Sequence, residues 1–430
     1  MAPREGAVED CRCDFETADD ATSEFFGPLL RDLTRRSFFR YFKVALDRPC
    51  PYWPDDGMCA RRECAVESCA DDEVPAPWLE EERNRSEWRG RGGGDALPGF
   101  LCEAVDAGPD AAVDRSFAAT VDWSESGGDE VWIDQPDDES GMIYVDLKAN
   151  PEGHTGYDGE PARRIWRAIY EENCFDLDEA PSPKEQLGQC LERRVFYKLV
   201  SGLQASISTH IATSDFGFWD VSSPFVNDAL FVDRVGGHRD RLDNLYFAYL
   251  FVLRAVTRAG AELVDYDYAT GDAADDAMTA ALVRRLTLLF AAPEDARMSP
   301  LERALAREHV DELRGQFLSR FRNVSQIMDC VTCERCRLWG KLQILGLGTA
   351  LKILLADGDA FGLGVLQRNE VVALVNTLAQ LAKSVDSIRA WQKRDVRRAT
   401  AKMAALAGLG LVVSAVFARL AWRRARPKAD

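Results

Sequence analysis

Three cysteines at regular spacing constrain this chain more than any other feature. Cys330, Cys333 and Cys336 form a Cys-x-x-Cys-x-x-Cys run, followed by an apolar, helix-compatible stretch that extends to Leu355. Cys333 and Cys336 lie one helical turn apart, so they can close into an exchangeable disulfide at the start of a helix. The helix N-terminus and the neighbouring Arg335 favour the thiolate. The run therefore predicts a redox-active pair rather than a structural crosslink.

Three alternatives give these cysteines other roles. Structural zinc needs four ligands, and no second Cys-x-x-Cys or nearby His is present, so only the remote Cys59 and Cys64 could complete the site. A ferredoxin-type cluster needs a fourth Cys three residues on, followed by Pro, where Trp339 and Gly340 stand instead. Inert buried cysteines are common singly, but they explain three at regular spacing poorly.

Longer motifs link this run to a known family. The run lies within one such motif, CVTCERCRLWGKLQ, and a second motif, GLGTALKI, follows it. Six more motifs lie upstream: RPCPYW, CARRECAV, NPEGHTGY, IYEENCF, FYKLVSGLQASI and RLDNLYF. In these motifs the chain resembles the endoplasmic reticulum oxidoreductins, flavin-dependent sulfhydryl oxidases that reoxidise protein disulfide isomerase. The resemblance runs discontinuously from about Cys11 to about Trp391. It implies an enzyme that takes electrons from the isomerase and passes them through FAD to molecular oxygen, giving hydrogen peroxide.

The resemblance also assigns the shuttle cysteines. Cys59 matches the thiol that meets the isomerase, and Cys64 matches the one that passes electrons inward to Cys333 and Cys336. The surrounding residues 49–145 are rich in proline, glycine and charge, which indicates long mobile loops. From this segment alone, a loop merely crosslinked by disulfides fits equally well.

Other cysteines receive structural or regulatory roles from the same resemblance. It implies the structural disulfides Cys50–Cys330 and Cys174–Cys190. In some relatives, bonds matching Cys59–Cys102 and Cys64–Cys69 switch the enzyme off. Cys69 and Cys102 are therefore expected to be regulatory.

The implied cofactor site consists of polar and aromatic side chains, namely Thr155, Trp166, Ser201, Arg234 and Arg241. Arginine suits a dinucleotide because its planar fork binds pyrophosphate through two hydrogen bonds. No Gly-x-Gly-x-x-Gly follows a strand pattern, so a Rossmann-type site is not supported.

Two positions depart from the family motifs. Gly153 stands where relatives have arginine, and Gln204 where they have histidine. These changes make a flavin-free, disulfide-stapled adaptor that binds isomerases one alternative function, and a zinc-binding interaction protein is another.

Helical periodicity predominates, and repeated strand alternation is scarce. Residues 23–46 predict a helix or a broken helix pair, and residues 144–156 a loop. Helical patterns extend over four further ranges: 161–173, 191–213, 301–321 and 370–391. Residues 242–256 are almost wholly apolar and predict a helix that is buried on most sides. We predict a mainly α fold, with a single helical core that binds FAD between helices, long irregular loops and a C-terminal hydrophobic helix.

The composition divides the chain into three parts. Residues 1–22 are expected to be a flexible segment, residues 23–395 the oxidase domain with the loops 49–145 inserted, and residues 396–430 a basic-flanked hydrophobic tail. Within the tail, Met403 to Trp422 is about as long as a bilayer-spanning helix. Basic residues lie on both sides of it, so the positive-inside rule orients it only weakly. We expect a membrane anchor with the catalytic part in the lumen.

Charge and cysteine content indicate the compartment. A net charge of −18 opposes binding to phosphate backbones, so nucleic acid is not an expected partner. Twelve cysteines suit an oxidising compartment, and glycosylation sequons at Asn84 and Asn323 are compatible with a secretory lumen. The residues MAPREGAVEDCRC contain no apolar leader. Because relatives carry a second Cys-x-Cys pair upstream of the one matching Cys11 and Cys13, we expect the true N-terminus to lie further upstream.

Overall fold

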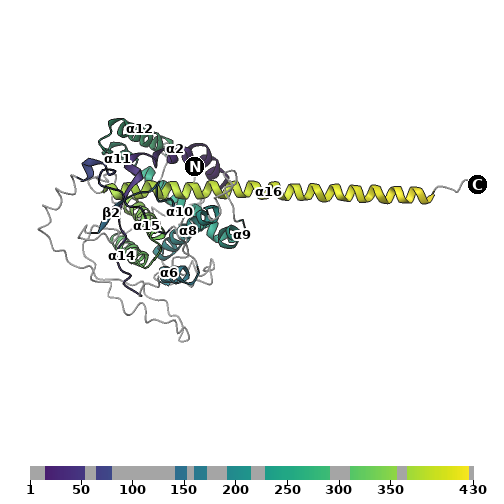
Figure 1. The fold of residues 1–430 in the computed structure, drawn as a ribbon, viewed down its shortest axis with the longest axis horizontal. Helices are drawn as coiled ribbons and strands as arrows, with labels where there is room; N and C mark the ends of the chain where they lie inside the picture. Colours follow the sequence, from purple (N-terminus) through teal and green to yellow (C-terminus); the bar gives the residue numbers. More distant parts are fainter. Residues whose placement is uncertain are drawn as a thin grey trace, which may run out of the picture.

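The computed structural model describes eight ranges of the chain: 15–53, 64–79, 141–152, 159–171, 191–214, 228–290, 310–355 and 366–425. Over these ranges the protein is built from helices that surround a central bundle, with a single two-stranded sheet at one side (Figure 1). The mainly α fold class is confirmed.

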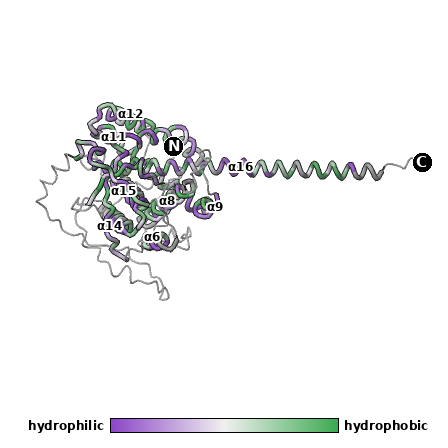
Figure 2. Tube along the Cα trace, in the orientation of Figure 1, coloured by the Kyte–Doolittle hydropathy of each residue, from purple (hydrophilic) through white to green (hydrophobic). Residues whose placement is uncertain are grey.

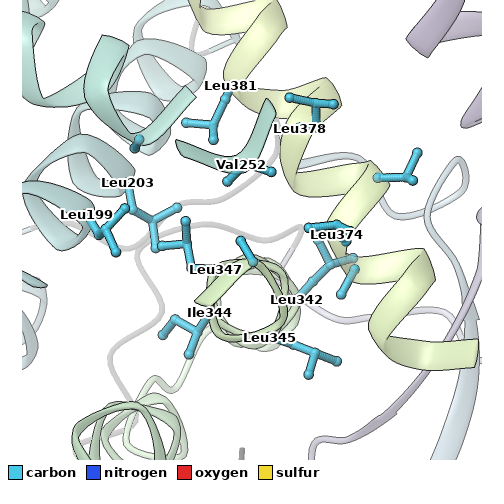
Figure 3. Close-up of a cluster of buried hydrophobic side chains, with 14 of the residues drawn as sticks. Leu199, Leu203, Val252, Leu342, Ile344, Leu345, Leu347, Leu374, Leu378 and Leu381 are labelled. Carbon is cyan, nitrogen blue, oxygen red and sulfur yellow. The ribbon is translucent and has the colours of Figure 1, made fainter. Parts of the chain in front are cut away.

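Four helices form the bundle: α8 (Leu191–Ser214), α10 (Arg239–Arg258), α15 (Glu334–Leu354) and α16 (Arg368–Ala425). Helix α15 is central, because every residue from Leu338 to Leu354 is buried. Figure 3 shows Leu342 and Leu347 of α15 among leucines of α8 and α16. The apolar sequence after the cysteine run therefore forms the middle of the core, which fixes the position of the thiol pair at its N-terminal end.

The other helices cover this bundle. They are α1 (Phe15–Ala21), η1 (Thr22–Phe26), α2 (Gly27–Leu33), α3 (Ser37–Arg40), α6 (Gly159–Glu171), α9 (Asp228–Phe231), η4 (Val232–Gly236), α11 (Gly260–Asp265), α12 (Ala273–Phe290) and α14 (Val310–Met328). Helices α6, α8 and α10 closely match the ranges predicted from the sequence. Helix α14 extends past the predicted end at residue 321, and residues 301–309 lie outside the described ranges.

The sheet departs from the sequence prediction. Strand β1 (Tyr41–Ala45) pairs antiparallel with β2 (Met142–Asp146), where a helix and a loop were predicted. The aromatic Tyr41 and Phe42 and the β-branched Val44 suit a strand, and burial alternates along it. The partner strand is about a hundred residues away, so local periodicity did not reveal the pairing.

A glycine permits close packing within the bundle. A Cβ atom at Gly202 of α8 would overlap the backbone carbonyl of Asn244 on α10. Although alanine favours helix by about 1 kcal/mol, we expect Gly202→Ala to lower the free energy of unfolding by about 2 kcal/mol, because backbone cannot move aside cheaply. Urea denaturation measures this effect. Gly260→Ala is the control, since its Cβ would make only ordinary contacts at 3.6 Å; equal stability of the two variants would contradict the packing account.

Helix α16 is longer than predicted. Its 58 residues run without a break from the core through the hydrophobic tail, which the sequence had suggested as separate segments. The C-terminal part of α16 extends away from the body of the protein (Figure 1), and this outer part is largely hydrophobic (Figure 2). Leu411 is 74% exposed and Phe417 68% exposed. Among the described residues this is the one helix long and apolar enough to cross a membrane, and none of its apolar window is buried.

Candidate active site: a thiol pair beside a cavity

The cysteine run lies at the junction of α14 and α15. Cys333 is the N-cap residue of α15, with extended backbone, and Cys336 lies in the first turn. Cys333 is fully buried and Cys336 is partly exposed, and both sulfurs are in the thiol form. Helix geometry places residues three apart on one face, so the predicted arrangement at a helix start is present.

A disulfide fixes this junction. Cys50, shortly after β1, is bonded to Cys330, the pairing that the resemblance implies. A buried ion pair between Lys341 and Asp329 joins α15 to the same turn. Burial raises the pKa of Asp329 and lowers that of Lys341, and their mutual attraction opposes both shifts.

The second thiol faces a cavity of about 250 Å³, of the order of known small-molecule sites. Helices α6, α8, α14 and α15 form its mainly apolar walls, and Cys336, Trp339 and Gly340 contribute from α15. Cys333 is not part of the lining. The cavity therefore exposes one sulfur of the pair to a bound molecule.

Three of the five expected cofactor contacts line the cavity: Trp166 of α6, Arg234 of η4 and Arg241 of α10. The two arginines are adjacent, since Arg241 Nη1 donates to the carbonyl oxygen of Arg234 at 2.6 Å. Ser201 is buried and is not a lining residue; its Oγ accepts a hydrogen bond from Asn244 at 3.0 Å. Thr155 lies outside the described residues, as does Gly153.

The shuttle segment docks on the same helix start. The Arg335 amide donates to the Cys64 carbonyl at 3.0 Å, and Arg335 Nε donates to the Ala65 carbonyl at 3.0 Å. The Val66 amide donates to Glu334 Oε2 at 2.7 Å. Arg335, which the sequence suggested as a thiolate partner, thus bonds the incoming chain through Nε. Cys64 is disulfide-bonded, and Cys59 lies outside the described ranges.

Asn150 was missed by the sequence analysis. It is fully buried, and its side chain bonds both the amide of Glu67, at 2.8 Å, and the carbonyl of Glu67, at 2.9 Å. Its carbonyl accepts a hydrogen bond from Trp339 Nε1 at 2.8 Å. One residue therefore connects the shuttle segment to the cavity wall.

A buried polar cluster beside the cavity was also missed. Glu152 lines the cavity and is 4% exposed; its Oε1 accepts from Gln343 Nε2 at 2.7 Å. His210 of α8 lies behind it, with Nε2 at 3.8 Å from Glu152 Oε2 and 3.1 Å from the Gln380 carbonyl. Burial raises the pKa of Glu152 to about 7 and lowers the pKa of His210 to about 3. Both groups are therefore neutral in mildly acidic solution.

The remaining predicted cysteines are described only in part. Cys69 is a free, half-buried thiol, and burial, followed by the nearby Glu73, raises its pKa to about 11. No bond joins it to Cys64 in this structure. Cys102, Cys174 and Cys190 lie outside the described ranges, as do Cys59 and the sequon at Asn84. Asn323 is 6% exposed within α14, so its sequon is inaccessible in the folded protein.

A thiol pair that begins a buried helix, opens on an apolar cavity and receives a second cysteine-bearing segment defines an oxidoreductase that acts on thiols. The chain belongs to the Endoplasmic Reticulum Oxidoreductin 1 family, whose model matches residues 26–388. The family resemblance read from the motifs is thereby confirmed.

Individual relatives agree with this assignment. The chain is 44% identical to endoplasmic reticulum oxidoreductin-1 of Arabidopsis thaliana over 394 residues, covering 89% of this chain and 79% of the relative. It is 36% identical to ERO1-like protein alpha of Mus musculus over 436 residues, covering 88% of each. A double cysteine-to-alanine mutant of S. cerevisiae Ero1p has a similar fold, with a TM-score of 0.59 at 29% identity, covering 90% of this chain and 99% of that one. Ero1p is described as the source of disulfide bonds for oxidative protein folding in the cell.

Proposed function

We propose that this protein is an FAD-dependent thiol oxidase of the endoplasmic reticulum, which generates disulfides by oxidising protein disulfide isomerase. The observation that carries the proposal is the shared cavity: Cys336 lines it together with Trp166, Arg234 and Arg241. A thiol, an aromatic surface and two arginine side chains are the chemistry that a flavin dinucleotide needs from its site.

The isomerase dithiol would attack the Cys59–Cys64 disulfide and leave as a disulfide through a mixed intermediate. The reduced shuttle pair would then exchange with the Cys333–Cys336 disulfide. Each dithiol oxidised gives up two electrons and two protons, and reduction of one O2 to H2O2 consumes both. FAD, when bound, supplies the two-electron acceptor between thiol and oxygen.

The chain's own part in this scheme is positional. The hydrogen bonds of Glu334 and Arg335 support this positional role, because they hold residues 64–66 at the start of the helix that carries Cys333 and Cys336. Trp339 is part of the cavity wall, and its Nε1 donates a hydrogen bond to the Asn150 carbonyl. The adjacent Arg234 and Arg241 would hold the pyrophosphate, and Trp166 offers a ring surface.

We also propose that the free Cys69 thiol belongs to a redox switch with Cys102. In the inactive form, Cys64–Cys69 and Cys59–Cys102 bonds would remove the shuttle pair from the cycle. Cys102→Ala should then sustain oxidation at low thiol concentrations at which the wild type slows. Identical thiol dependence of the two proteins would argue against the switch.

The outer part of α16 is proposed to anchor the protein in the membrane, with the catalytic domain on the lumenal side. Its apolar residues face outward on all sides, and basic residues lie at both ends. Where the helix leaves the core, Arg394 bonds Asp228 of α9 at 3.2 Å, and Arg398 pairs with the same carboxylate.

Purification of the full chain tests the proposal. The protein should be yellow, and it should consume oxygen and release an equal amount of hydrogen peroxide when reduced isomerase is added. A colourless protein that binds the isomerase without consuming oxygen would favour the flavin-free adaptor instead.

A further inference from the structure

We propose that Asn150 is a positioning residue for disulfide exchange, which holds residues 64–69, the shuttle segment, in register with the start of the helix that carries Cys333 and Cys336. The inference rests on the proposed function, which supplies the exchange step. It comes from the hydrogen bonds that Asn150 makes in two directions: its side chain binds the shuttle segment, and its backbone carbonyl binds the cavity wall.

The side chain of Asn150 binds one residue of the shuttle segment as a neighbouring β-strand would. Its Oδ1 accepts a hydrogen bond from the Glu67 amide at 2.8 Å, and its Nδ2 donates to the Glu67 carbonyl at 2.9 Å. Two directly opposed residues of an antiparallel sheet exchange the same pair of bonds. Because Asn150 follows the last residue of β2 by four positions, its side chain continues the pairing past the end of that strand.

Backbone groups on both sides of Glu67 are also bound by the body of the protein. On the C-terminal side, Ser68 forms an antiparallel bridge to β2. On the N-terminal side, Arg335 binds the carbonyl groups of Cys64 and of the residue that follows it, each at 3.0 Å. Since these bonds go to the backbone, they fix the course of the chain. Cys64 therefore lies at the helix start, where Cys333 is the N-cap residue.

Asn150 is itself held firmly in the core. It is 0% exposed, and both its backbone amide and its Nδ2 donate to the Asp146 carbonyl at 3.0 Å. Its own carbonyl accepts a hydrogen bond from Trp339 Nε1 at 2.8 Å, and Trp339 lines the cavity three residues after Cys336. Hydrogen bonds in such a buried site are stronger than in water. One rigid residue therefore holds both the shuttle segment and the turn of α15 beside the cavity.

Disulfide exchange requires this register. The Cys64 thiolate would attack the sulfur of Cys333, which lies at the helix start and does not line the cavity. The Cys64–Cys333 bond forms as the Cys333–Cys336 bond breaks, and Cys336 leaves as a thiolate on the cavity side. A disulfide needs its two Cα atoms within about 4.4–6.8 Å of each other, and misplacement by about 1 Å can slow a reaction about 10²-fold. A hold on the chain three residues after Cys64 limits such misplacement.

Asn150→Ala removes both bonds to Glu67 but keeps the backbone carbonyl that binds Trp339. The turnover number with saturating isomerase should fall on the order of tenfold, because two hydrogen bonds that hold the shuttle segment are lost. The KM for the isomerase should not rise, since the isomerase meets Cys59 before the internal exchange takes place. Oxygen-electrode assays over a range of isomerase concentrations measure both quantities.

Asn376→Ala is the matched control. Asn376 of α16 is 4% exposed, and its Nδ2 also donates to two carbonyl groups, that of Val372 at 2.9 Å and that of Phe39 at 2.8 Å. These bonds reach neither the shuttle segment nor the cavity wall. Thermal unfolding should show a similar loss of stability in the two variants, but Asn376→Ala should keep the wild-type turnover number per folded molecule.

A crosslinking measurement follows the exchange geometry without flavin. The reporter chain carries three substitutions: Cys59→Ser, Cys69→Ser and Cys336→Ser. Diamide can join its Cys64 and Cys333 thiols by taking two electrons and two protons from them, and mass spectrometry of the digested chain gives the initial rate at which this bond forms. Asn150→Ala in the reporter chain should slow crosslinking on the order of tenfold, and Asn376→Ala should leave the rate unchanged.

Equal crosslinking rates in the Asn150→Ala and Asn376→Ala reporter chains would overturn the role of Asn150 but leave the flavin enzyme intact. Absence of the Cys64–Cys333 bond in the reporter chain with Asn150 in place would overturn both proposals, because the shuttle segment would then not reach the inner pair.

Discussion

Cys336→Ser should lower the rate of oxygen consumption by a factor on the order of 10³ or more, the scale seen when a catalytic nucleophile is removed. Serine is close in size to cysteine, so the cavity and its lining are retained, but an alcohol cannot form a disulfide or deliver electrons. Oxygen-electrode assays with reduced isomerase measure the loss. The variant should keep its flavin and its thermal stability.

Cys69→Ser is the matched control for this prediction. It also removes one thiol, but from the segment whose Cys69 amide donates to the Tyr144 carbonyl of β2 rather than from the cavity wall. Its rate should equal or exceed that of wild type. Substantial activity in Cys336→Ser, or equal losses in both variants, would show that electrons do not pass through the helix-start pair.

Removal of residues 403–430 should move the protein from the membrane to the soluble fraction. Exposed side chains such as Leu406, Val412 and Phe417 make water an unfavourable solvent for this helix, and each favours the bilayer centre by about 0.3–0.6 kcal/mol. About 20 helical residues span the roughly 30 Å of hydrocarbon. Arg419 lies near the end of the segment, where it can extend toward the headgroups.

Alkaline carbonate extraction measures this effect. The full chain should stay in the pellet, and the shortened chain should appear in the supernatant with unchanged turnover per molecule. A wash in high salt separates the alternatives, because release by salt alone would indicate that the basic residues only adhere to anionic lipid. Release of the full chain by carbonate would contradict a spanning helix.

The main helices and the redox pair could be predicted from the sequence because their signals are local. The helical pattern of α8 and the almost wholly apolar run of α10 can each be recognised within a single stretch of sequence. The Cys333–Cys336 spacing likewise indicates a redox pair from one helical turn alone. The continuity of α16 was harder to predict, because the basic stretch between its core part and its hydrophobic tail has the composition of a linker. In the structure the helix continues through this stretch, where Arg394 and Arg398 both pair with Asp228.

The supporting contacts could not be predicted, because each joins distant parts of the chain. Asn150 bonds Trp339 across 189 residues, and Gln343 bonds Glu152 across 191. The burial of Glu152 and His210, which raises the pKa of the first and lowers the pKa of the second, is likewise not visible in the sequence. The pairing of β1 with β2 was not predicted, for the same reason.

The most direct test follows the flavin itself. Reduced isomerase, added without oxygen to the purified full-length protein, should bleach the flavin absorption band in proportion to the dithiol supplied. Admission of oxygen should restore the band. In Cys336→Ser the band should persist throughout. A wild-type protein with no flavin band, or a band that reduced isomerase leaves unchanged, would contradict electron transfer from this thiol pair to a flavin in the adjoining cavity.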